Sequence, residues 1–112
     1  MPHKHYQECI EACQECSTIC NHCAASCLME DDVKAMRLCI QLDLECAAVC
    51  DAAARVMSLN GELSEQLCQL CADICNRCAE ECEKHSDIAH CRQCAETCRK
   101  CAEICASMAQ HA

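Results

Sequence analysis

The spacing of the cysteines constrains the fold of this chain more than any other feature, because it alternates between steps of three and four residues. Steps of this kind place side chains on one face of an α-helix, at the a and d positions of a heptad. Three blocks of five cysteines share the spacing: Cys13, Cys16, Cys20, Cys23 and Cys27; Cys68, Cys71, Cys75, Cys78 and Cys82; and Cys91, Cys94, Cys98, Cys101 and Cys105. The pattern predicts helices whose buried stripe is made of thiols.

The remaining cysteines extend this register. Cys9 precedes the first block by one turn, and a further stretch carries Cys39, Cys46 and Cys50. Asp43 stands between Cys39 and Cys46, where a cysteine would complete the block. We therefore expect a stripe of thiols on every helix, with one carboxylate among them.

The scarcity of helix breakers indicates four helices, over approximately residues 2–28, 33–59, 63–84 and 88–110. The chain has a single proline, Pro2, and a single glycine, Gly61. Proline is tolerated at a helix start, and Asn60-Gly61 is a good helix stop. Joins this short make neighbouring helices antiparallel. The sequence predicts an all-α fold, an up-down-up-down four-helix bundle that forms one domain over residues 1–112.

Composition restricts the function and the compartment. The net charge of −9 argues against nucleic acid as a partner, because binding phosphate requires a basic surface. No apolar run is long enough to span a membrane, and no secretory leader is visible after Met1. We therefore expect a cytoplasmic protein. Thiols stay reduced in that compartment, so 19 cysteines indicate metal binding before they indicate disulfides.

The cysteine spacing suits a soft metal ion. Residues three or four apart on a helix have Cβ atoms about 5–6 Å apart, whereas a disulfide needs about 3.5–4.5 Å. Thiolates select Cu(I) or Zn(II). Four thiolates around each zinc ion would leave negative charge in a narrow core, whereas each Cu(I) replaces about one thiol proton. The charge balance therefore favours the binding of multiple Cu(I) ions, at roughly one ion per cysteine.

With CxxxC pairs such as Cys16/Cys20 and Cys46/Cys50 in a cysteine-lined four-helix bundle, the chain resembles the bacterial copper storage protein family, in its cytosolic branch. The resemblance covers residues 9–105. It implies Cu(I) bound along the interior by pairs of thiolates, a homotetramer, and an entrance lined by His and Met. It also makes Asp43 a polar or occasional ligand, although a hydrogen-bonded buried acid, or a residue rotated off the stripe, explains Asp43 equally well.

Candidate weaker ligands lie at both ends of the predicted bundle. One end gathers His5, Met57, Met108 and His111, which we expect to form the entrance. The opposite end offers Met29, Met36, His85 and His90. Thioether and imidazole bind Cu(I) more weakly than thiolate does, which suits a site that passes ions inward.

Three other functions deserve comparison. A zinc or general metal–thiolate buffer of metallothionein type is the main alternative, and stoichiometry separates it from copper storage. A thiol oxidoreductase would need a reactive CxxC in a βαβ context, and no strand pattern accompanies Cys68 and Cys71. An iron–sulfur carrier would favour CxxCxxC runs, which do not occur. We therefore expect no enzymatic activity. Ile40, Leu44 and Val49 are candidates for an oligomer interface.

Overall fold

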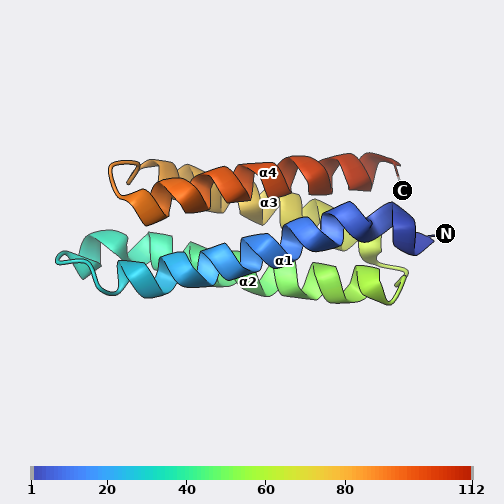
Figure 1. Ribbon diagram of the computed structural model, residues 1–112, viewed down its shortest axis with the longest axis horizontal. Helices are drawn as coiled ribbons and strands as arrows, with labels where there is room; N and C mark the ends of the chain where they lie inside the picture. Colours follow the sequence, from blue (N-terminus) through green and yellow to red (C-terminus); the bar gives the residue numbers. More distant parts are fainter. Residues whose placement is uncertain (1, 112) are drawn as a thin grey trace.

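The residues that the structure describes fold into four long helices that run alternately up and down. The computed structural model describes residues 2–111, and the side chains of residues 6–109 within them. The elements are α1 (Pro2–Cys27), a turn of 3-10 helix η1 (Val33–Met36), α2 (Arg37–Ser58), α3 (Ser64–Glu83) and α4 (Ala89–His111). The chain starts and finishes at the same end of the bundle (Figure 1). The predicted antiparallel four-helix bundle is confirmed.

The bundle is narrow, with principal extents of 48 × 18 × 17 Å. Helix α1 packs against α2 and α4, and α3 packs against the same two helices. Small side chains flank the thiols where neighbouring helices meet, among them Ala47, Ala72, Ala79 and Ala95, all of which are buried. Because the distance between helix axes depends on the side chains at the contact, alanine lets the helices approach closely. The space that remains is a single column along the axis, and cysteine fills it.

The turn between α2 and α3 follows from Asn60 and Gly61. Asn60 adopts a left-handed backbone conformation, with φ of 54°. The amide of Gly61 donates to the carbonyl of Val56 at 3.0 Å, and the amide of Asn60 donates to the carbonyl of Met57 at 3.0 Å. This pair of hydrogen bonds is a Schellman motif, which satisfies the carbonyls that a helix end leaves free. The helix stop expected at these two residues therefore has a defined geometry.

The second helical segment differs from the prediction in its first turn. Residues Val33–Met36 form η1, and the α-helix begins at Arg37 rather than at Val33. The carboxylate of Asp32 accepts a hydrogen bond from the amide of Ala35 at 3.3 Å, so Asp32 caps this turn. The tighter turn still buries Met36, which is 2% exposed. The other helix ends fall within one residue of the expected bounds.

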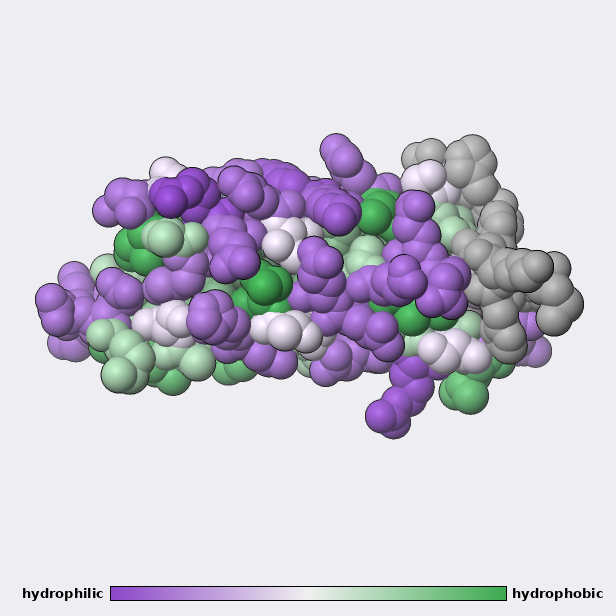
Figure 2. Space-filling view, in the orientation of Figure 1, coloured by the Kyte–Doolittle hydropathy of each residue, from purple (hydrophilic) through white to green (hydrophobic). Residues whose placement is uncertain are grey.

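The outer surface is mainly hydrophilic, with scattered apolar patches on the face shown (Figure 2). Charged side chains occupy the helix positions between the cysteines, and some of them link helices. Arg99 of α4 donates to both carboxylate oxygens of Glu83, at 2.7 and 3.0 Å, and to the amide oxygen of Asn76 at 3.1 Å. Among the described residues, no helix is long and apolar enough to cross a membrane.

Candidate metal centre

A continuous column of free thiols forms the centre of the bundle. All 19 cysteines are unpaired, and each is at most 1% exposed. The heptad spacing explains this arrangement, because every a or d position of an antiparallel bundle faces the axis. The structure therefore brings together every cysteine that the sequence predicts as a metal ligand. In a conventional bundle the same positions would hold leucine and isoleucine.

The sulfur atoms are close enough to share metal ions. Within one helix, Sγ of Cys16 lies 3.9 Å from Sγ of Cys20, and Cys101 lies 3.8 Å from Cys105. Contacts between helices are often shorter, because Sγ of Cys9 lies 3.2 Å from Sγ of Cys105. Many CxxxC pairs thus contact neighbouring helices as well as each other. Bridging of one ion by sulfurs from different helices needs little rearrangement.

Groups of four sulfurs recur along the column. In each group the Sγ atoms all lie within 4.8 Å of one another. Four all-cysteine groups are Cys13, Cys71, Cys101 and Cys105; Cys16, Cys46, Cys50 and Cys75; Cys16, Cys20, Cys46 and Cys98; and Cys20, Cys78, Cys94 and Cys98. Because Cys16, Cys20, Cys46 and Cys98 each serve in two of these groups, the column is a connected network rather than a row of separate sites.

Hydrogen bonds and burial shift the pKa values of the thiols in opposite directions. Hydrogen bonds from Cys23 and Cys82 lower the pKa of Cys39 to about 3. Burial raises the pKa of Cys91 to about 12, and the charge of Cys39 adds to the effect. A thiolate in the column is therefore stabilised by its protonated neighbours. Only some thiols can ionise at once unless cations replace the protons.

Asp43 lies on the thiol stripe and is fully buried. One carboxylate oxygen accepts hydrogen bonds from Cys78 at 3.2 Å, Cys94 at 3.4 Å and Cys82 at 3.6 Å. The other oxygen accepts from Cys39 at 3.9 Å. Burial raises the pKa of Asp43 to about 8, and negative charge on Cys94 and Cys39 adds to this. Asp43 is therefore a buried acid that accepts hydrogen bonds from four thiols, and its side chain is not rotated away from them.

At the end of the bundle that holds both chain termini, the described residues place a methionine within the core. Met57 is fully buried, and its Sδ accepts a hydrogen bond from Sγ of Cys68 at 3.4 Å. Tyr6, which precedes Cys9 in α1, is buried. Met108 is partly buried and packs against the core. Of the two expected weaker ligands here whose side chains the structure describes, Met57 and Met108, Met57 contacts a thiol directly. The side chains of His5 and His111 lie outside the described residues.

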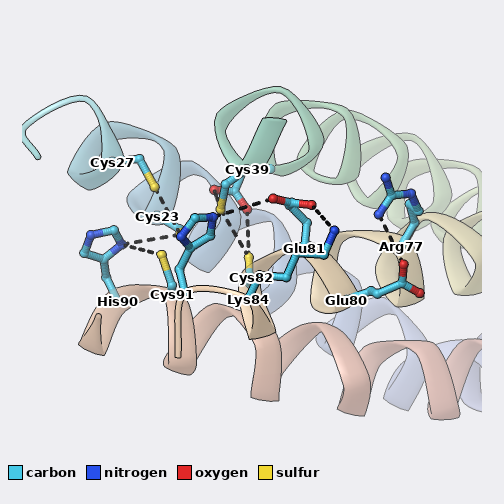
Figure 3. A network of polar contacts seen from close by, with 12 residues as sticks. Cys23, Cys27, Cys39, Arg77, Glu80, Glu81, Cys82, Lys84, His90 and Cys91 are labelled. Carbon is cyan, nitrogen blue, oxygen red and sulfur yellow. Dashed lines mark hydrogen bonds and ion pairs between the residues drawn. The ribbon is translucent and has the colours of Figure 1, made fainter. Parts of the chain in front are cut away.

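The opposite end carries two histidines, each with a carboxylate nearby. Nε2 of His85 lies 3.6 Å from Glu81, which also pairs with Lys84 at 3.2 Å. Nε2 of His90 lies 3.1 Å from a carboxylate oxygen of Glu30. The other ring nitrogen of His90, Nδ1, lies 3.4 Å from Sγ of Cys23. Figure 3 shows His90 beside Cys23, Cys27 and Cys91.

The sequence named His90 as a candidate ligand at the less favoured end, but it did not identify Glu30 as the partner of His90. His90 is one position away from the stripe, and Glu30 belongs to the turn after α1, so neither follows the heptad register. The signal that was available is the direct adjacency of His90 to Cys91. The contact of Glu30 with His90 spans 60 residues and depends on how the two turns meet at this end.

Known proteins resemble this chain in sequence and in structure. A family model described as "Copper storage protein" matches residues 2–110. The apo copper storage protein 3 of Bacillus subtilis is 46% identical, covers 93% of this chain and 98% of its own, and superposes with a TM-score of 0.87. A cytosolic copper storage protein of Streptomyces lividans, solved with five coppers, is 36% identical over 97% of this chain and 95% of its own, with a TM-score of 0.90.

A curated relative matches a shorter stretch. The uncharacterized cysteine-rich protein YhjQ of Bacillus subtilis is 45% identical over 70 residues, which are 62% of this chain. The matched part spans 65% of the length of YhjQ.

Proposed function

Because the chain belongs to the copper storage protein family, we propose that it stores and buffers Cu(I) as thiolate complexes along the interior of its bundle. The single observation that carries this proposal is the column of 19 free, buried thiols. Soft thiolate surroundings select Cu(I). Each bound Cu(I) replaces about one thiol proton. A loaded column therefore stays close to neutral at roughly one ion per cysteine.

The proposed ligands are the 19 cysteines, with Asp43 as an additional oxygen ligand or hydrogen-bond acceptor in the layer of Cys78 and Cys94. The distances support this assignment, since Asp43 already contacts both thiols. A loaded layer would ionise these thiols and remove the hydrogens that Asp43 now accepts. We expect Asp43 either to contact an ion there or to keep its proton.

For the entrance, the structure supports the His90 end better than the end of His5, Met57, Met108 and His111. The His90 side chain is 15% exposed, so it touches both solvent and the thiols of Cys23 and Cys91. Met57, by contrast, has no exposed surface. Stopped-flow measurement of Cu(I) loading separates the two ends. We expect His90→Ala to take up Cu(I) more slowly at unchanged capacity. We expect no such slowing in Met57→Ala/Met108→Ala. The reverse result would return the entrance to the methionine end.

A zinc buffer of metallothionein type is the competing function. The four-sulfur groups have the ligand number that Zn(II) requires, so geometry alone does not separate the two metals. The connected network favours Cu(I), because tetrahedral zinc ions could not all use sulfurs that belong to two groups. A storage role needs no catalytic turnover, and we propose none.

The proposal places the protein in the cytoplasm as a homo-oligomer. The cytosolic relative from Streptomyces lividans supports the location. Leu44 is 51% exposed on α2, and Ile40 and Val49 pack partly buried beside the core. An apolar face of this kind is suited to contact between subunits. Sedimentation analysis of the wild type and of Leu44→Glu would test whether this face forms a tetramer.

The decisive experiment is an anaerobic titration of the reduced protein with Cu(I), in competition with a high-affinity chelator, followed by gel filtration. We expect tight binding of roughly one ion per cysteine with the helical circular dichroism retained. Zinc is expected to saturate near one ion per four thiols. Saturation after a few Cu(I) ions, with zinc bound more tightly, would refute the storage function.

A further inference from the structure

We propose that the copper-free bundle carries one Zn²⁺ ion at its His90 end, bound by Cys23, Cys27, Cys91 and Nδ1 of His90. The three Sγ atoms and Nδ1 all lie within 4.8 Å of one another. Two of the ligands come from the last turns of α1 and two from the first turn of α4. A Cys₃His set of four is a common form of structural zinc site. The site goes beyond copper storage, since it concerns the protein before copper arrives.

Three of the six distances among these ligand atoms match tetrahedral zinc, and the other three are at most 4.8 Å. With Zn–S of about 2.3 Å and Zn–N of about 2.0 Å, tetrahedral ligands lie about 3.8 Å apart for two sulfurs and about 3.5 Å apart for sulfur and nitrogen. Here Sγ of Cys23 lies 3.9 Å from Sγ of Cys27. Nδ1 of His90 lies 3.4 Å from Cys23 and 3.6 Å from Cys91. Shifts of about 1 Å or less in the remaining pairs would complete a tetrahedral set around an ion at the centre of this group.

Glu30 fixes the ring of His90 in the form that binds a metal. A carboxylate only accepts hydrogen bonds, so the nitrogen facing Glu30 at 3.1 Å must carry the hydrogen. In the neutral imidazole this leaves the lone pair on Nδ1, which faces Cys23 and Cys91. A carboxylate that orients a ligating histidine in this way is typical of zinc sites. Glu30 is therefore a positioning residue, reaching the ring from the turn after α1.

Charge and burial distinguish this group from the all-cysteine groups. Zn²⁺ with four thiolates carries a net charge of −2, and those groups lie fully buried in the column. Zn²⁺ with three thiolates and a neutral imidazole carries only −1. His90 is also 15% exposed, so water reaches the edge of the site. Among the groups of four described above, the Cys₃His group is consequently the least costly place for a divalent ion.

The site would link the ends of two helices that lie side by side at one end of the bundle and are not consecutive in the chain. An ion there holds the end of α1 against the start of α4, beside the two turns. It also occupies three thiols that Cu(I) uses when the column is full. Resting on the proposed storage function, the inference implies that copper loading expels this zinc ion, because thiolates bind Cu(I) more tightly than Zn²⁺. Zinc would thus occupy the entrance only while copper is scarce.

Titration of the reduced, copper-free protein with Zn²⁺ against a chromophoric chelator tests the proposal. We expect one equivalent bound at least tenfold more tightly than any later one. Co²⁺, used as a spectroscopic substitute, should show the ligand-field bands of a tetrahedral S₃N site rather than an S₄ site. Both signals should be lost in His90→Gln. Glu30→Gln should keep the S₃N spectrum and weaken binding about 10- to 100-fold.

His22→Gln is the matched control, because His22 lies exposed on α1 beside the same Cys23. It should leave the tight equivalent unchanged. An equally tight equivalent in His90→Gln, an S₄ spectrum, or several zinc ions of equal affinity in the wild type would overturn the proposal. Cu(I) capacity measured on the same preparations separates the two functions. Full copper capacity without a tight zinc ion refutes only the zinc site, and a tight zinc ion with low copper capacity refutes only storage.

Discussion

Replacement of Asp43 by asparagine should remove a large pH dependence from the stability of the apo protein. The carboxyl group has no exposed surface, and burial raises its pKa from the ordinary value of 3.8 to about 8. The folded state therefore keeps a proton on Asp43 over a pH range in which the unfolded chain has lost it. Asparagine has nearly the same shape and accepts hydrogen bonds from thiols, but it does not titrate.

The sign and the size follow from proton linkage. A group whose pKa is raised by folding contributes fully below the unfolded pKa, and this contribution is lost as pH rises through the folded pKa. Between those values the free energy of unfolding falls by about 1.4 kcal/mol per pH unit, or about 2.7 kcal/mol from about pH 5 to pH 7. Because native proteins are stable by only about 5–15 kcal/mol, the loss is easily measured.

Anaerobic urea unfolding, followed by circular dichroism at both pH values, provides the assay. Because the two proteins share every other titratable group, the quantity of interest is the difference between wild type and Asp43→Asn at each pH. We expect this difference to move by about 2.7 kcal/mol in favour of the variant as pH rises. Parallel curves for the two proteins would refute the reasoning, because they would mean that Asp43 ionises as freely in the bundle as in the unfolded chain.

Three further substitutions test the packing and the column. Met57→Ala removes a fully buried side chain, so urea unfolding should show a loss of about 2–5 kcal/mol, whereas Met108→Ala, at a partly buried position, should cost less. Gly61→Ala brings a Cβ within 2.7 Å of Cγ1 of Val56, so we expect a lower melting temperature. A melting temperature equal to that of the wild type would contradict this close contact. Cys46→Ala/Cys75→Ala should lower Cu(I) capacity by about two ions without loss of helix, since neutral thiols behave as small apolar side chains; unchanged capacity would show that these sulfurs are not ligands.

The sequence was sufficient for the helices and for the thiol column, because both depend on local periodicity. Every cysteine placed on the stripe by its spacing is buried at the axis. Asp43 could be placed on the stripe in the same way, but its partners Cys78, Cys82 and Cys94 come from other helices. Their identity depends on the vertical register of the bundle, which heptad spacing does not fix.

The histidine end was less accessible to sequence reasoning for a physical reason. His90 and Glu30 meet where two turns close the bundle, and turn geometry is set by contacts such as the Asp32 cap rather than by a repeat. The methionine end was predicted as the entrance because Met57 and Met108 follow the register. The same register explains why Met57 is buried, since a residue at a core position of the heptad faces the bundle axis.

The slender shape of the bundle has a consequence for the order in which ions move. The thiol column runs along a bundle that is 48 Å long and 18 Å wide. Neighbouring sulfurs, such as those of Cys9 and Cys105 or of Cys16 and Cys20, lie 3.2–3.9 Å apart, so an ion can advance by exchange from one thiol to the next. With the entrance proposed at His90, the ions stored near His90 would be the last to arrive and the first to leave, while those near Met57 would exchange most slowly.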